Sequence, residues 1–114
     1  MVVVLMSFLP ASAHHGRGSY DGTKVITLKA TVTQFEWKNP HCALHFDSTD
    51  DKGNIQNWNL ETEPPLTLTE RGWTRNSLNP GDIVTVDFYA AKDGTKTGVL
   101  DRVVLADGKE LGHH

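Results

Sequence analysis

A run of residues near the start of the chain alternates between apolar and polar side chains and then changes phase. Residues 25–37 read VITLKATVTQFEW, with apolar residues at even positions from Ile26 to Val32 and at odd positions from Phe35 onward. A period of two is typical of a β-strand with one buried face. Because a one-residue slip would turn the buried side chains outward, we predict a β-bulge near Thr33 and Gln34. A long strand that bends midway can pair with two partners, as a small barrel requires.

Four later segments also have the composition of strands. They are residues 41–48 (HCALHFDS), 55–61 (IQNWNLE), 83–90 (IVTVDFYA) and 99–111 (VLDRVVLADGKEL), and the facing of the last is ambiguous. Turn residues separate them, with Gly53 and Asn54 before the third strand and Asp93-Gly94 before the fifth. The alternation predicts a core made of Leu28, Val32, Phe35, Leu44, Phe46, Trp58, Leu60, Val84, Val86 and Phe88.

One short helix is predicted between the third and fourth strands. Pro64 and Pro65 precede residues 66–71, and proline is tolerated in the first turn of a helix. Gly72 supplies a residue that can end the helix in the left-handed conformation. The order of elements predicts an all-β fold, a small five-stranded OB-like Greek-key barrel with one short helix between strands three and four. A plain five-stranded meander or an open sandwich is the alternative.

The size and charge of the chain limit the kinds of partner it can have. Its 114 residues suit one domain, and 38% of them are hydrophobic. The net charge of −3 offers no basic surface for nucleic acid or anionic lipid. Cys42 is the single cysteine, so no internal disulfide can form.

The first residues have the pattern of a secretory signal peptide. A short apolar run, VVVLM followed by Phe8-Leu9, ends at Pro10 and Ala11-Ser12-Ala13, which suits cleavage before His14. The apolar run is too short to span a bilayer, which needs roughly 20 residues. We therefore predict a signal peptide at residues 1–13, lacking its usual basic start, and one periplasmic or secreted domain at residues 14–114. A buried N-terminal strand of a cytosolic protein is the alternative.

Three separated motifs resemble an uncharacterised family of exported bacterial domains. They are Ala13-His14-His15, Trp37-Lys38-Asn39-Pro40-His41, and the segment GWTRNSLNPGD at residues 72–82. The resemblance covers nearly all of the chain after residue 13 and implies a periplasmic or secreted domain, with no activity to carry over. Asp21 matches an acidic position of the family pattern, whereas Cys42 and His45 stand where that pattern has apolar or aromatic residues.

A new N-terminus at His14 would create a metal chelate. The free α-amine and the imidazole of His14 can bind one ion through two nitrogens, and imidazole-rich sites suit Cu(II), Zn(II) or Ni(II). His41 is the predicted distant ligand, because Pro40 places it at a loop, and His15 is an alternative or supporting ligand. His45 is four residues from His41, roughly 13 Å along a strand, which is too far for one metal ion. The alternative is a polar tail without a function.

The sequence favours binding over catalysis. It contains no nucleophile elbow, phosphate loop or His-Glu-x-x-His motif, and His113 and His114 are left out of the site because they are equally typical of a tag. The main prediction is a copper carrier or buffer. The second is a non-metal module whose barrel face binds an envelope protein or a saccharide, and a copper oxidase is a weaker third. Trp37, Trp58 and Trp73 are interpreted as packing residues.

Overall fold

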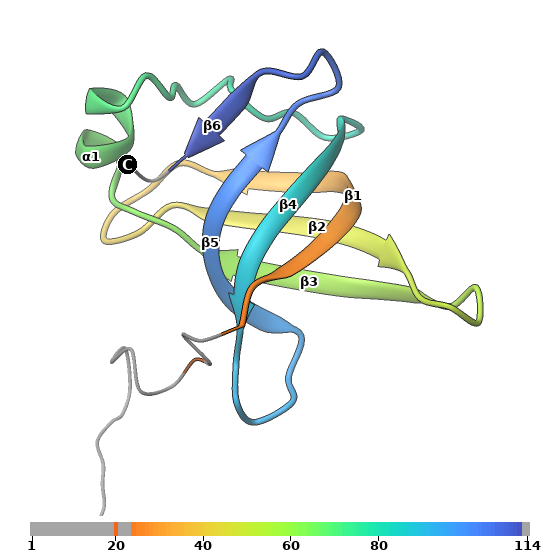
Figure 1. Cartoon of the computed structure of the whole chain (residues 1–114). Helices are drawn as coiled ribbons and strands as arrows, with labels where there is room; N and C mark the ends of the chain where they lie inside the picture. The colour runs from red at the N-terminus through yellow and green to blue at the C-terminus, as the bar shows by residue number, and fades with distance from the viewer. Residues whose placement is uncertain (1–19, 21–23, 113–114) are drawn as a thin grey trace, which may run out of the picture.

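In a computed structural model the chain is described at residue 20 and at residues 24–112 (Figure 1). The predicted signal peptide, the His14-His15 doublet and the terminal pair His113 and His114 lie outside the described residues. The elements, in chain order, are β1 (Ile26–Glu36), β2 (Ala43–Thr49), β3 (Ile55–Glu61), α1 (Pro65–Glu70), β4 (Ile83–Ala90), β5 (Thr97–Val104) and β6 (Glu110–Gly112).

The first strand, β1, bends and pairs with two neighbours, as its change of phase predicts. Residues 26–31 pair with β4 and residues 31–36 pair with β2, both antiparallel. The register with β2 shifts between Val32 and Gln34, so that Thr33 is the extra residue of a bulge. The predicted bulge is confirmed. It lets Val32 stay in the core while Phe35, three residues later, faces the same interior.

The sheet closes into a barrel through one parallel pairing. Its strands follow the order β3-β2-β1-β4-β5-β6, and β3 also pairs with β5 over residues 59–61 and 97–99. The result is a closed barrel of β1 to β5, which Figure 1 shows in strongly curved ribbons. With the single helix between β3 and β4, this is the predicted OB-like Greek-key barrel. A meander or open sandwich would lack the pairing of β3 with β5, so that alternative is wrong.

The short helix α1 begins one residue earlier than predicted and ends one residue earlier. Pro65 is its first residue, where the missing proline N–H costs no helical hydrogen bond. Gly72 has a φ of 91°, a left-handed conformation that glycine adopts without strain. This turn directs Trp73 into the protein, where it is 1% exposed. In Figure 1 the helix lies at the same end of the barrel as β6.

The prediction of one strand over residues 99–111 is wrong, because a turn that contains Gly108, at a φ of 90°, divides this stretch into β5 and a sixth strand, β6. It pairs with β5 outside the closed barrel and buries Leu111, which is 7% exposed. The carbonyl oxygen of Gly112 accepts a hydrogen bond of 3.1 Å from the indole N–H of Trp73. Trp73, in the segment after the helix, and the last described residue, Gly112, are therefore held together by this hydrogen bond.

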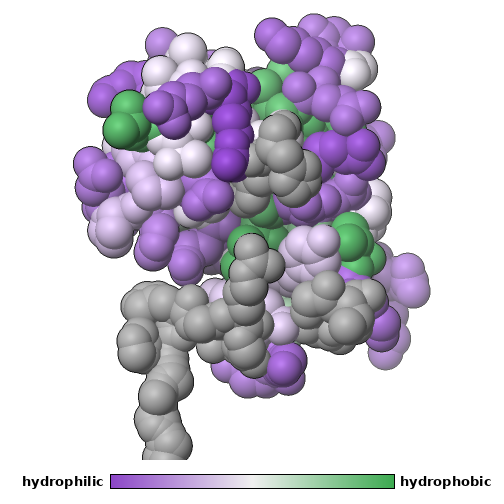
Figure 2. All heavy atoms as spheres, turned by 60° about the vertical axis from the view of Figure 1, so that its left-hand side comes forward, coloured by the Kyte–Doolittle hydropathy of each residue, from purple (hydrophilic) through white to green (hydrophobic). Residues whose placement is uncertain are grey.

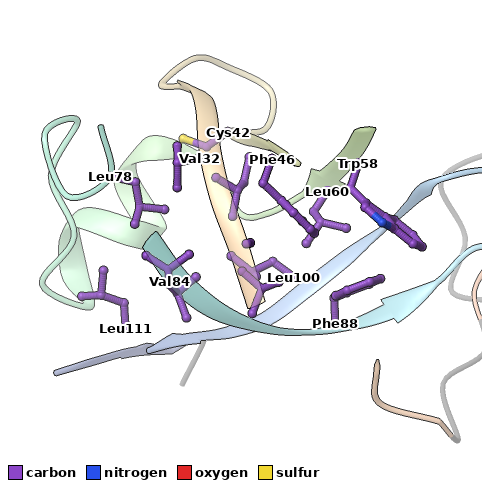
Figure 3. Packing of buried hydrophobic residues seen from close by; sticks show 14 of the residues in the cluster. Val32, Cys42, Phe46, Trp58, Leu60, Leu78, Val84, Phe88, Leu100 and Leu111 are labelled. Atoms are coloured by element: carbon purple, nitrogen blue, oxygen red, sulfur yellow. The ribbon is translucent and has the colours of Figure 1, made fainter. Parts of the chain in front are cut away.

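The barrel interior is one apolar cluster (Figure 3). Eight of the ten predicted core residues are buried. The other two, Leu28 and Phe35, are only partly buried and pack against the cluster. The ring of Phe35 packs 5.8 Å from that of Trp73 and 5.9 Å from that of Trp37, at the end of the strand rather than at its centre. Residues outside the predicted set complete the core, and they are Ala30, Cys42, Leu68, Trp73, Leu78, Leu100, Val103 and Leu111.

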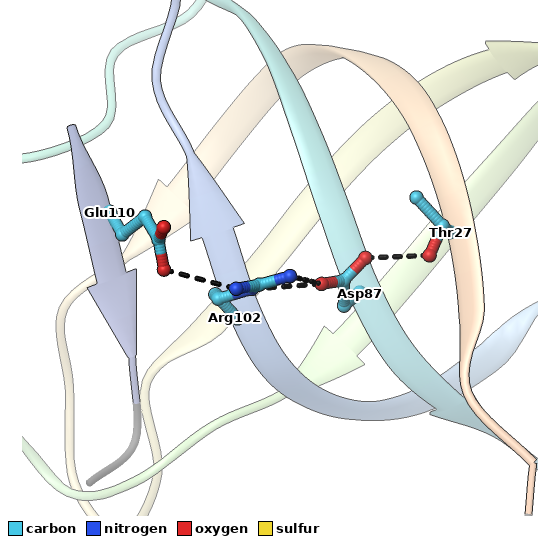
Figure 4. Close-up of polar contacts among 4 residues, drawn as sticks. All are labelled: Thr27, Asp87, Arg102 and Glu110. Carbon is cyan, nitrogen blue, oxygen red and sulfur yellow. Dashed lines mark hydrogen bonds and ion pairs between the residues drawn. The ribbon is translucent and has the colours of Figure 1, made fainter. Parts of the chain in front are cut away.

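A polar network crosses the outside of the barrel (Figure 4). Asp87 is 7% exposed, and its carboxylate accepts hydrogen bonds from Thr27 Oγ1 at 2.7 Å and from Arg102 Nε at 2.9 Å. Arg102 also donates to Glu110 at 3.0 Å. The network therefore links β1, β4, β5 and β6, and it satisfies a carboxylate that would be costly to bury alone.

Candidate functional site

His41, the predicted metal ligand, lies just before β2, where the backbone is well fixed. It follows the cis peptide bond between Asn39 and Pro40. The next residue, Cys42, receives its backbone hydrogen bonds from the chain beyond β3: its N–H donates to Glu63 O, and its carbonyl accepts from Thr62 N, both at 3.0 Å. The pairing of β2 with β3 thus continues past the ends of both strands and fixes the backbone next to His41.

A carboxylate faces the His41 ring. Glu61 pairs with Ala43 across the sheet, and its Oε2 lies 3.6 Å from Nδ1 of His41. The side chain of His41 is 38% exposed and that of Glu61 is 30% exposed. Because Nδ1 is the nitrogen near the carboxylate, Nε2 lies on the other side of the ring. The separation of 3.6 Å is that of an ion pair and is longer than a hydrogen bond.

His45 forms a second histidine–carboxylate pair on the same face of the sheet. Its Nε2 lies 2.7 Å from Oε1 of Glu36, and Lys38 Nζ lies 3.3 Å from the other oxygen of that carboxylate. The hydrogen bond with His45, and then that with Lys38, lowers the pKa of Glu36. The His45 side chain is 27% exposed, so it is half-buried. Its ring is bound to Glu36, a different carboxylate from the partner of His41.

Tyr20 connects the N-terminal part of the chain to the barrel. It forms an isolated antiparallel bridge with Ala91, whose N–H donates to Thr97 O at 3.0 Å. Thr97 in turn pairs with Asn59 of β3. Burial, followed by the negative charges of Glu61 and Asp93, raises the pKa of Tyr20. The phenol therefore lies within electrostatic range of the carboxylate that faces His41.

The comparison with known families covers β1 to β4 and ends within β5. Residues 3–101 match a family of unknown function, DUF6152. The chain belongs to this family. The match confirms the resemblance to an uncharacterised family, and membership brings no activity with it. No curated protein matches the chain.

The structure describes one of the three predicted metal ligands. His41 is described, whereas His14 and His15 lie outside the described residues. Within residue 20 and residues 24–112, no group of three or more His, Cys, Asp or Glu side chains is arranged to hold a metal ion.

Sequence reasoning missed Glu61 as the partner of His41. The two residues are far apart in sequence, and Glu61 comes from the neighbouring strand β3, so no local motif marks the pair. The register of the hairpin formed by β2 and β3 could have revealed the pair. Counting outward from the turn at residues 50–54 pairs Thr49 with Ile55 and Ala43 with Glu61, as observed.

Cys42 has a structural role in the described part of the chain. Its side chain is completely buried in the core, and burial raises the pKa of its thiol. Since the thiolate is the form that binds metals, a buried thiol of this kind is a poor ligand.

The three tryptophans are packing residues, as predicted. Trp58 and Trp73 are buried, and Trp37 is partly buried against the core. The ring of Trp58 lies 4.8 Å from that of Phe88, and Lys96 Nζ lies 5.2 Å above it.

The described surface is mostly polar. The face seen in Figure 2 is largely hydrophilic, with small separate apolar areas. The large apolar side chains that are exposed come from different parts of the fold, and they are Val25, Ile55, Leu66 and Ile83. Of the helices described, none has the length and apolar character needed to cross a membrane.

Proposed function

We propose that this protein is an exported carrier or buffer for a transition-metal ion, with Cu(II) as the favoured ion. The ligands are the α-amine and imidazole of His14, exposed by cleavage after Ala13, and the imidazole of His41. His15 is a supporting or alternative ligand. The proposal names a binding protein and assigns no catalytic step.

The bridge between Tyr20 and Ala91 is the observation that carries the proposal. The path across the sheet from Tyr20 to Asn59 runs through Ala91 and Thr97. It covers three strand spacings, about 14 Å at about 4.8 Å each. Glu61 lies two residues further along β3, about 7 Å away. The direct distance from Tyr20 to the Glu61–His41 pair is thus about 16 Å. A six-residue stretch from His14 to Tyr20 reaches up to about 20 Å when extended, so the tether is long enough.

The chemistry of His41 also supports the proposal. Its ring is half-exposed, so an ion can approach it from solvent, and Glu61 faces one of its two nitrogens. Neutral imidazole and neutral amine nitrogens are good ligands for Cu(II). The net charge of the protein, −3, does not repel a cation. A loop histidine and a tethered amine therefore form a reasonable site for one divalent ion.

A copper titration with three variants tests the proposal. Protein that begins at His14 should bind one equivalent of Cu(II) tightly, with nitrogen hyperfine features in its electron spin resonance spectrum. His14→Ala and His41→Ala should each weaken binding strongly, because each removes a ligand. His45→Ala is the matched control and should have little effect, since His45 is paired with Glu36. Equal affinity of the wild type and His41→Ala would contradict the proposal.

A second candidate function rests on the outer face of β1 to β3. Gln34, Asn57 and Asn59 are exposed there, and amide side chains of this kind hydrogen-bond to sugar hydroxyls or to peptide groups. OB barrels commonly bind oligomeric ligands on the face of strands two and three. Metal-free protein that binds an envelope oligosaccharide, with chemical shifts changing at Asn57 and Asn59, would favour this function over metal binding.

A further inference from the structure

We propose that the free edge of β3, at residues 55–58, binds an extended segment of a partner protein as an added β-strand. The indole N–H of Trp58 and the ammonium group of Lys96 lie at this edge, so the segment carries an acidic side chain that binds both donors. This interaction surface is formed by described residues alone and does not depend on the proposed metal site.

The first four residues of β3 have a neighbouring strand on one side only. Along its whole length β3 pairs with β2, whereas β5 pairs with it only at residues 59–61. In Figure 1 the hairpin of β2 and β3 extends beyond the other strands. The N–H of Asn59 donates to the carbonyl oxygen of Lys96, so the N–H groups of Asn57 and Ile55 also point away from β2. Their N–H and C=O groups therefore form an edge on which no described strand pairs.

This edge lacks the features that keep a free strand from pairing. Natural proteins protect such edges with charged side chains, proline, bulges or a covering segment. Residues 54–60 read NIQNWNL, with no charged residue, no proline and no glycine, and Ile55 is 66% exposed. By contrast, β6 is only three residues long, and its Glu110 accepts a hydrogen bond from Arg102 at 3.0 Å. The edge of β3 is thus the better place to add a strand.

Trp58 supplies an unsatisfied hydrogen-bond donor at this edge. Its side chain is 9% exposed, and its Nε1 is shielded from solvent without a hydrogen-bond partner in the part of the chain that the structure describes. A buried donor without a partner costs free energy, and phenylalanine would fill an apolar position without that cost. The indole N–H of Trp73, in contrast, donates to Gly112 O at 3.1 Å. An indole N–H left unpaired inside the protein indicates an acceptor that a bound molecule supplies.

Lys96 determines the charge that the added segment should carry. Its Nζ lies 5.2 Å from the centre of the Trp58 ring, and its carbonyl oxygen accepts from Asn59 where β5 begins. Figure 3 places Trp58 at one end of the apolar cluster. The lysine side chain is exposed, so it can turn to admit a ligand. Because the indole and the ammonium group are both donors and an ionised carboxylate only accepts, an Asp or Glu side chain of the added strand satisfies both. Backbone pairing supplies the remaining hydrogen bonds.

A library of short random peptides displayed on phage is the probe, and it is selected against the protein. The selected peptides should share one Asp or Glu within a β-forming sequence. When a synthesised peptide binds, the amide hydrogens of Ile55 and Asn57 should become protected from exchange, and the indole N–H resonance of Trp58 should move downfield. The indole N–H of Trp73 already has a partner, so its resonance is the internal control and should not move.

Variants separate the backbone contribution from that of the two donors. Asn57→Pro removes an N–H that points away from β2, so the hairpin is retained while strand addition is blocked. It should weaken peptide binding at least about tenfold, because pairing hydrogen bonds are lost. Trp58→Phe and Lys96→Met should each weaken binding by about twofold to tenfold, the usual effect of losing one hydrogen bond. Lys29→Met is the matched control, since Lys29 is exposed where β1 pairs with β4, and it should have no effect.

Circular dichroism and the urea midpoint first establish that each variant is folded. If the selection yields no binding peptide, or if bound peptides leave the amides of Ile55 and Asn57 unprotected, the proposed surface is wrong. Equal peptide affinity of the wild type and Asn57→Pro also refutes strand addition. Selected peptides without a shared acidic residue would overturn the role of Trp58 and Lys96. Protection of the same amides that rises with protein concentration, in the absence of peptide, would assign the edge to a second copy of this chain and overturn the partner protein.

Discussion

Phe88 should be one of the residues on which the stability of the barrel depends most. Its side chain is completely buried, and its ring lies 4.8 Å from that of Trp58 and 6.1 Å from that of Phe46, both in edge-to-face arrangements. Phe88→Ala should lower the free energy of unfolding by about 4 kcal/mol, the middle of the range for a buried phenylalanine. Phe88→Leu retains most of the apolar volume but loses the aromatic contacts, so we expect a loss of about 2 kcal/mol.

Thermal and urea unfolding followed by circular dichroism would measure both changes. For a domain of this size, about 1 kcal/mol corresponds to about 4–8 °C in Tm, so Phe88→Leu should lower Tm by about 8–16 °C. Ile55→Ala is the control, because Ile55 is 66% exposed, and it should change stability by less than about 0.5 kcal/mol. If Phe88→Ala lowers the free energy of unfolding by less than about 1 kcal/mol, this ring does not lie in a close-packed core.

Two further predictions concern backbone space and pH. A Cβ at Gly98 would overlap the carbonyl oxygen of Tyr89 on the paired strand, so Gly98→Ala should cost about 3 kcal/mol in urea unfolding. Gly94→Ala, at a φ of 83° with nothing close to its Cβ, should cost only about 1–2 kcal/mol; an equal cost at both glycines would refute the close approach. The lowered pKa of Glu36 stabilises the folded state above the unfolded pKa of about 4.3, and this stabilisation is lost as the pH falls through the lower, folded value. Glu36→Gln should therefore lose less stability than the wild type on acidification below about pH 5, and parallel curves for the two proteins would contradict the pairing with His45.

The barrel was predictable where a sequence pattern reports directly on geometry. The phase slip between Val32 and Phe35 predicted the bulge, because side chains of a strand must alternate between faces. Pro65 and Gly72 predicted the helix because each suits one end of it. The strands β5 and β6 were predicted as one because the turn at Asp107 and Gly108 was read as part of the strand. Trp73 and Leu78 lie in irregular segments, where no periodicity marks a buried residue.

The candidate site was predictable in part. His41 follows from its motif and its place after Pro40, and the chemistry of an imidazole is independent of the fold. Glu61 could have been found by extending the hairpin register, since the turn at residues 50–54 determines which residues face each other. The bridge between Tyr20 and Ala91 could not, because it joins distant parts of the chain through a single pair with no alternating pattern.

The most direct test of the proposed metal site is a comparison of two N-termini. One protein begins at His14, as its mass should show after export, and the other carries one extra residue before His14. The extra residue removes the chelating α-amine and retains every side chain, including His41 and Glu61. We predict that the extended protein binds Cu(II) more than about tenfold more weakly, a loss of about 1.4 kcal/mol or more. Equal Cu(II) affinity of the two proteins would contradict the proposed site.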